Sequence, residues 1–154
     1  MSKSVRIIGI DPGLRRCGWG IVDALDNRLS FVAAGTVTPP IDGMLADRLA
    51  LLAAGLKEVL VQFDPIEAAV EETFVNAGPR SALILGQARG VALVTPAQSG
   101  LYVAEYATNL VKKSVVGTGH ADKKQVELMV RTLLPTAQFK GADAADALAV
   151  AICH

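Results

Sequence analysis

Short apolar runs bounded by turn residues alternate along this chain with longer stretches in which apolar residues recur every three or four positions. The first run, residues 5–10, is almost entirely aliphatic or glycine, which predicts a strand buried on both faces. It ends on Asp11, which is followed by a Pro-Gly turn signal. Two more strands are expected at residues 18–23 and 28–38, joined by a turn at Asp26-Asn27. Because the connections are short, these three strands should form an antiparallel meander.

The rest of the chain alternates helical and strand patterns. A single apolar stripe predicts a helix at residues 42–63, which we expect to cover the sheet and to carry no chemistry. A fourth strand, residues 68–72, ends on two acids, and a fifth is expected at residues 101–105. Further helices are expected at residues 80–95, 107–113, 121–134 and 141–152. This order predicts a mixed α/β fold with antiparallel and parallel strand pairs.

The helix expected at residues 80–95 is apolar or small on two sides. Gly86 and Gly90 stand one turn apart, and each costs about 1 kcal/mol of helix propensity relative to alanine. That cost suggests close packing along their stripe. Either both sides pack within the chain, or one side packs against the sheet and the other against a partner chain. The pattern alone leaves both alternatives open.

Length and composition narrow the class of protein. A chain of 154 residues is the size of one domain, which we expect to span residues 1–154. Its composition, with 51% hydrophobic and 19% charged residues, indicates a folded protein. No apolar run approaches the roughly 20 residues that cross a bilayer, and the N-terminus lacks a signal-peptide pattern. Cys17 and Cys153 are expected to be free thiols in a reducing cytoplasm. The apolar pattern of the last helix reaches the final residues, so we expect that a short tail is missing.

Four acids, far apart in sequence, attract attention. Asp11 ends a buried strand where loops of α/β sheets carry function, although an Asp before Pro-Gly also simply starts a turn. Asp143 and Asp146 share one helical face; the helix macrodipole explains Asp143 better than Asp146, which lies among alanines. Glu71 follows a buried strand. If the first and fourth strands pair and the last helix crosses them, the four carboxylates meet.

Such a site would offer oxygen ligands only, without His or Cys. This set is typical of Mg²⁺ or Mn²⁺ rather than zinc. Two such ions about 3.5–4 Å apart stabilise the attacking and leaving oxygens of a phosphodiester, so we expect hydrolysis by water. The formal net charge of zero does not by itself indicate a nucleic-acid binder, but clustered acids can mask a basic face elsewhere.

Several motifs, in order, resemble the RuvC family of bacterial Holliday-junction resolvases. The motifs are Gly9-Ile10-Asp11-Pro12-Gly13, Val70-Glu71-Glu72-Thr73-Phe74, Ser81-Ala82-Leu83 with Leu85-Gly86-Gln87-Ala88-Arg89-Gly90, Val115-Val116-Gly117 and Ala142-Asp143-Ala144-Ala145-Asp146-Ala147-Leu148. The match is collinear from about Arg6 to His154, and the ordered set is more specific than any one motif.

The resemblance implies an RNase H-like fold, in which a five-stranded mixed sheet with its first three strands antiparallel is flanked by helices. It implies a homodimer that nicks two opposed strands of four-way junction DNA symmetrically, by metal-dependent phosphodiester hydrolysis, in homologous recombination and DNA repair. A partnership with the RuvA-RuvB branch-migration complex follows in the same way, and no membrane partner is expected.

The resemblance also assigns roles to residues. It implies that Asp11, Glu71, Asp143 and Asp146 are catalytic and hold divalent metal, expected to be two Mg²⁺ ions with Mn²⁺ as the substitute. Phe74 would stack on DNA bases. Lys112 and Lys123 would approach the scissile backbone, and the adjacent Lys113 and Lys124 could substitute for them. The dimer helix would present Ala82, Leu83, Gly86 and Gly90.

Three other positions are treated differently. Glu72 lies where the family varies, and we do not include it in the site. Ile84 stands where many relatives carry a basic residue, which puts a DNA or solvent contact there in doubt. His120 is expected on the surface.

Three alternatives compete with a junction resolvase. Sugar kinases and actin-like ATPases share the Asp-x-Gly turn, but they need a second domain to close over ATP. A catalytically dead module that only binds branched DNA is disfavoured by four intact acids. The smaller YqgF-type nucleases are a related alternative, against which Phe74 and the helix at residues 81–90 favour RuvC.

Overall fold

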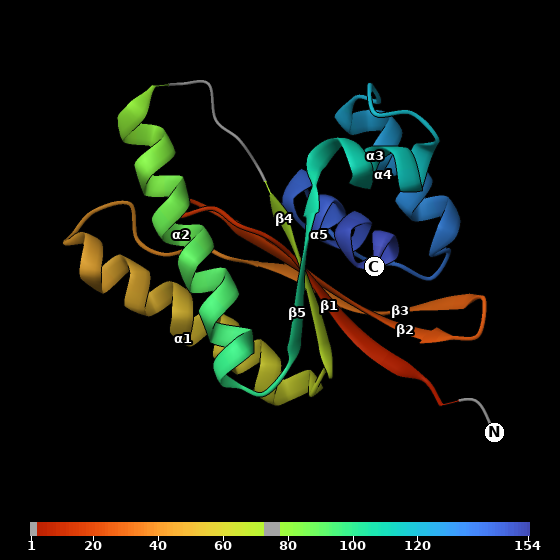
Figure 1. The fold of residues 1–154 in the computed structure, drawn as a ribbon, viewed down its shortest axis with the longest axis horizontal. Coiled ribbons are helices and arrows are strands. Elements are labelled where there is room, and N and C mark those ends of the chain that lie inside the picture. The colour runs from red at the N-terminus through yellow and green to blue at the C-terminus, as the bar shows by residue number, and fades with distance from the viewer. Residues whose placement is uncertain (1–2, 73–77) are drawn as a thin grey trace.

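Five strands form one mixed sheet in the computed structural model, which describes residues 3–72 and 78–154. The strand order is β3-β2-β1-β4-β5, with β1 (Val5–Asp11) in the centre (Figure 1). β1 runs antiparallel to β2 (Cys17–Leu25), which runs antiparallel to β3 (Arg28–Val37). On its other side β1 pairs in parallel with β4 (Glu67–Glu72), and β4 with β5 (Tyr102–Ala107). The predicted mixed sheet with an antiparallel meander is confirmed.

Helices cover both faces of this sheet (Figure 1). One face carries α1 (Leu45–Phe63) and α2 (Pro79–Gln98). The other carries α3 (Thr108–Val116), α4 (Lys123–Leu133) and α5 (Ala142–Cys153). None of the helices in the described ranges is long and apolar enough to cross a membrane.

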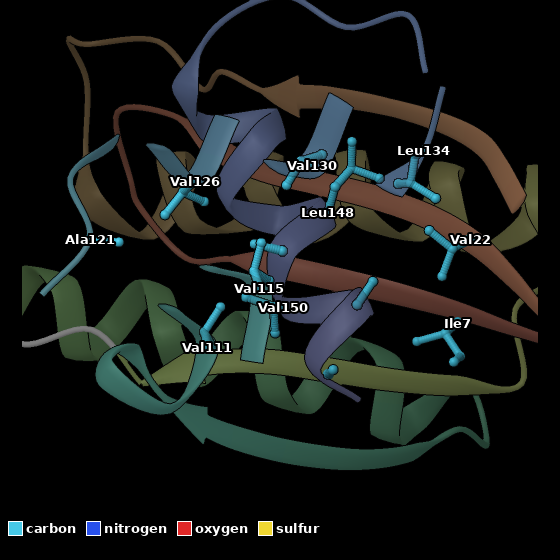
Figure 2. Packing of buried hydrophobic residues seen from close by; sticks show 13 residues of the cluster. Ile7, Val22, Val111, Val115, Ala121, Val126, Val130, Leu134, Leu148 and Val150 are labelled. Atoms are coloured by element: carbon cyan, nitrogen blue, oxygen red, sulfur yellow. The ribbon is translucent and has the colours of Figure 1, made fainter. Parts of the chain in front are cut away.

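Strand alternation divides the apolar residues of β1 between two cores. Ile8 and Ile10 point to one face and pack with α1 and α2. Ile7 points to the other face, where it joins side chains of α3, α4 and α5 around Leu148 (Figure 2). Asp11 follows Ile7 in steps of two, so its side chain belongs to the α5 face. The sheet itself therefore directs this acid toward the last helix.

Glycines on β1 and β2 let α5 lie unusually close to the sheet. A Cβ on Gly9 would be only 2.1 Å from the carbonyl oxygen of Ala147, and one on Gly18 would be 2.0 Å from that of Asp143. Real Cβ atoms do not approach backbone so closely, so both positions require glycine as long as α5 keeps this place. The contact at Gly18 holds the start of α5 beside the Asp11 end of the sheet.

The helices differ from the predicted ranges mainly at their ends. α1 begins at Leu45 rather than near residue 42, because Gly43 has a positive φ of 107° that interrupts the helix. α2 continues through Pro96 to Gln98, although proline predicts an end at residue 95. Pro96 is fully buried, and this packing offsets the hydrogen bond that proline cannot donate. α3 extends to Val116 and ends at Gly117, whose φ is 94°.

Candidate active site

Two of the four predicted acids meet on adjacent parallel strands. Ile10 of β1 is paired with Val70 of β4, so the next residues along the two strands, Asp11 and Glu71, are neighbours. Glu71 lies on the same face as Ala69, which belongs to the core under α5. Its side chain is buried, with only 7% of the residue exposed. Strand pairing thus brings together two carboxylates that are sixty residues apart in sequence.

The other two acids come from the start of α5. Asp143 lies in the first turn and Asp146 one turn later, on the same side of the helix. All four carboxylates line one pocket of about 190 Å³, several times the volume that a water molecule occupies in the liquid. The pocket is completed by residues of α3, α4 and α5: Thr108, Val111, Lys112, Lys123, Val126 and Ala149.

Crowding of negative charge changes the acidity of this site. Burial, followed by repulsion from Glu71 and Asp146, raises the pKa of Asp11 to about 9. A side-chain hydrogen bond with Glu71 contributes to the same shift. Burial and the charge of Glu71 raise the pKa of Asp146 to about 6, while Lys123 and Lys112 act in the opposite direction. Positive charge brought into the pocket would therefore stabilise the ionised carboxylates.

The donor set of the pocket fits a hard divalent cation. Its oxygen-only ligands suit Mg²⁺ or Mn²⁺, and a bound cation would relieve the repulsion that adds to burial in raising the pKa of Asp11. Within residues 3–72 and 78–154, no three His, Cys, Asp or Glu side chains already form a group spaced to hold a metal ion.

The structure separates the four predicted lysines into two pairs. Lys112 of α3 and Lys123 at the start of α4 line the acid pocket. Their neighbours Lys113 and Lys124 are exposed and are not among the residues that line it. Each lysine pair occupies adjacent positions on a helix, which point about 100° apart, so only one member of each can face the acids.

The remaining predicted residues lie outside the pocket. Phe74 lies outside the described residues. Along α2, the residues Ala82, Leu83, Gly86 and Gly90 are exposed, and a Cβ on either glycine would meet nothing within 4 Å. Ile84 is half-buried and packs against the core beneath α1 and α2. His120 is exposed, as expected.

Sequence reasoning missed two features of the pocket. Thr108 lines it, and its hydroxyl donates a hydrogen bond of 3.2 Å to the backbone oxygen of Glu72, which ties the start of α3 to the end of β4. Arg16 forms an ion pair with Asp143, with a distance of 3.6 Å from Nε to Oδ2. The sequence carries no local signal for this contact, because the two residues are far apart along the chain.

Comparison of the sequence with known proteins gives one consistent family. The family model described as "Crossover junction endodeoxyribonuclease RuvC" matches residues 7–154. A protein of that name from Methylocella silvestris is 62% identical over 151 residues, covering 98% of this chain and 86% of that protein. One from Rhizobium etli is 58% identical, covering 100% of this chain and 91% of that protein.

Solved structures agree with the sequence comparison. The structure described as T. thermophilus RuvC in complex with Holliday junction substrate has a TM-score of 0.89 and 33% identity, covering 97% of this chain and 92% of that one. The yeast mitochondrial Holliday junction resolvase Ydc2, with a TM-score of 0.69 and 13% identity, covers 97% of this chain and 78% of that one, and shares the fold. These neighbours confirm the predicted RNase H-like fold.

Proposed function

The chain belongs to the RuvC family of crossover junction endodeoxyribonucleases, and from this premise we propose that its acid pocket nicks opposed strands of four-way DNA junctions. The observation that supports this most strongly is the meeting of Asp11, Glu71, Asp143 and Asp146 in one pocket from three separate elements. The reaction is phosphodiester hydrolysis by water. It serves homologous recombination and DNA repair in the family as a whole.

The four carboxylates are the proposed ligands of divalent metal, which we expect to be two Mg²⁺ ions. When bound, such ions supply Lewis-acid chemistry that lowers the pKa of water and stabilises a leaving 3′ oxygen. The chain's part is to hold the carboxylates at one end of a rigid sheet. Gly9 and Gly18 do this by fixing α5 against β1 and β2.

Lys112 and Lys123 have a complementary role in the proposed reaction. They bring positive charge to a pocket that is otherwise acidic and already oppose the rise in the pKa of Asp146. A DNA phosphate entering this pocket needs such charge, because the four acids would otherwise repel it. The hydrogen bond from Thr108 to Glu72 fixes the first turn of α3. Lys112 lies one turn further along the same helix.

We also propose that two copies of the chain pair through α2. Its exposed stripe is apolar and small, with Leu83 63% exposed and open space beside Gly86 and Gly90. The propensity cost of those glycines is unexplained within one chain, and a second helix packed on them would explain it. A homodimer would present two acid pockets to the two strands of a symmetric junction. Sedimentation of the Gly90→Glu variant should show monomers where the wild type shows dimers.

The setting of the reaction follows from the family. We propose that the protein acts in the bacterial cytoplasm, where the chromosome lies, and receives junctions from a RuvA-RuvB branch-migration complex. Phe74 remains the proposed base-stacking residue at the opened junction.

Cleavage of synthetic DNA tests the proposed function. The wild-type protein should nick a four-way junction with Mg²⁺, leave linear duplex of the same sequence uncut, and cut neither with EDTA. Asp146→Asn should bind the junction nearly as tightly but cut it at least about 100-fold more slowly. Asp42→Asn, in an exposed loop outside the pocket, is the matched control and should cut normally. Equal cutting of duplex and junction would refute junction selectivity.

A further inference from the structure

A second hollow opens beside the acid pocket, and three arginines line it. We call it the arginine groove; it encloses about 440 Å³ and is lined by Arg15, Arg16, Arg48, Ser81 and Asp143, among others. Its residues come from the turn after β1, from α1, from the first two turns of α2 and from the start of α5. Asp143 lines both this groove and the acid pocket, so the two hollows adjoin at that residue.

Local structure holds the arginines in place. The turn after β1 is so tight that a Cβ on Gly13 would lie 2.4 Å from the carbonyl oxygen of Arg16. This fixes the backbone that carries Arg15 and Arg16. On α1, Nε of Arg48 donates a 2.8 Å hydrogen bond to the carbonyl oxygen of Pro40. Arg48 is thereby held at a defined place in the groove, which reduces the entropy cost of using it to bind a ligand.

The charge of the groove is mostly uncompensated. Arg16 pairs with Asp143 at 3.6 Å. Within the two described ranges, no carboxylate lies within ion-pairing distance of Arg15 or Arg48. Three guanidinium groups thus face one carboxylate in a chain whose formal net charge is zero. The positive charge is a property of this place rather than of the whole surface.

We propose that the arginine groove binds the phosphodiester backbone of the DNA strand that passes through the acid pocket. This rests on the proposed function, since the strand must leave the pocket somewhere, and the groove adjoins the pocket at Asp143. Planar guanidinium forks match phosphate oxygens and stay charged at any working pH. Arg16 would exchange part of its 3.6 Å pairing with Asp143 for a phosphate when DNA binds. The groove adds affinity and position without reading sequence.

Salt dependence of binding tests the proposal. The test variant is Arg15→Gln with Arg16→Gln, two exposed side chains on the turn. The matched control is Arg28→Gln with Lys57→Gln, which removes the same charge at the β2–β3 hairpin and on the later part of α1. Binding of a fluorescent four-way junction is measured in EDTA, so that no strand is cut, between 50 and 300 mM salt at roughly five points.

The test variant should weaken binding at least about tenfold at 0.1 M salt and reduce the slope of log Kd against log salt by about two. The loss should be the same for junctions of different sequence, because phosphate contacts do not read bases. The control should change affinity by less than about twofold. Equal effects of test and control variants would overturn the proposal, since net charge alone would then explain them. Arg48→Gln should add a further loss, provided that circular dichroism shows a native fold.

Neutral DNA provides an independent check. Methylphosphonate linkages beside the mapped cut site remove phosphate charge. They should weaken junction binding by the wild-type protein, but should cause no further loss of binding in the test variant. Additive losses would overturn the proposal. If the wild type cuts no junction, the proposed function fails, whereas the salt slope on duplex DNA still decides whether the arginines contact phosphate. If it cuts junctions and both variants behave alike, only the groove is refuted.

Discussion

Glu71 and Glu72 are adjacent in sequence but point to opposite faces of the sheet. Glu71 lines the acid pocket, while strand alternation turns the side chain of Glu72 toward the face that carries α1 and α2. We expect Glu71→Gln to slow junction cutting at least about 100-fold, because it removes a charge on which the site depends. Glu72→Gln should cut within about threefold of the wild type. Single-turnover cleavage at saturating protein measures both.

The two variants can be compared directly, because each replaces a glutamate by glutamine and the two positions are adjacent in the sequence. Loss of cutting in both would indicate that the end of β4 as a whole is sensitive, rather than the carboxylate of Glu71. Normal cutting by Glu71→Gln would remove that residue from the proposed site. Circular dichroism and junction binding show whether either variant is misfolded.

Asp11 should destabilise the metal-free fold as the pH rises. Its pKa is raised from an ordinary 3.8 to about 9, so the folded protein holds this proton where the unfolded chain has released it. The free energy of unfolding therefore falls with rising pH across that window and does not depend on this group below it. Asp11→Asn cannot ionise. It should exceed the wild type in stability by on the order of 1–2 kcal/mol at pH 8, and by less at pH 5.

Urea denaturation in EDTA at the two pH values measures this difference. A constant difference between the proteins, or a variant less stable than the wild type at pH 8, would contradict the prediction. Asp42→Asn serves again as the control, and its difference from the wild type should not grow with pH, because Asp42 lies outside the pocket.

The seating of α5 on the sheet depends on a residue without a side chain. A Cβ on Gly9 would lie 2.1 Å from one backbone atom of α5 and 2.7 Å from another, so Gly9→Ala must displace the helix. We expect a loss of about 3 kcal/mol in the free energy of unfolding. Gly119→Ala, whose nearest contacts would be at an ordinary 3.5 Å, should change stability by less than about 1 kcal/mol. Urea titration of both variants compares them.

Most helices and strands could be predicted because their apolar residues follow a clear pattern along the sequence. The buried runs gave the strands, and the apolar stripe of α1 gave that helix to within three residues at its start. The end of α2 could not be predicted, because the burial of Pro96 depends on tertiary packing. Local preference disfavours proline there, and the packing around it offsets that preference.

The acids could be predicted as a set, while the groove could not. Motif order and the polar residues in apolar surroundings indicated Asp11, Glu71, Asp143 and Asp146. Nothing in the sequence relates Arg48, on a helix expected to carry no chemistry, to the turn after β1. That relation exists only once α1 has folded onto the sheet. The contact of Arg16 with Asp143 is equally non-local.

Divalent metal should stabilise the whole molecule, because its proposed ligands join β1, β4 and α5. Mg²⁺ that binds only the folded state adds about 1.4 kcal/mol at ten times its dissociation constant. The melting temperature should therefore rise with Mg²⁺ and return to its starting value with EDTA. Asp146→Asn should show a smaller rise, measured by calorimetry without DNA. An equal rise in that variant would place the metal elsewhere.

Two of the four acids belong to α5, which begins at Ala142. A copy cut short between Glu71 and Ala142, on a stalled ribosome or by a protease, carries Asp11 and Glu71 but lacks the two acids of α5. Under the proposed function, such unfinished polypeptides cannot break the chromosome from which they are being expressed. The proposed site is therefore complete only after α5 has been synthesised and has packed onto the sheet.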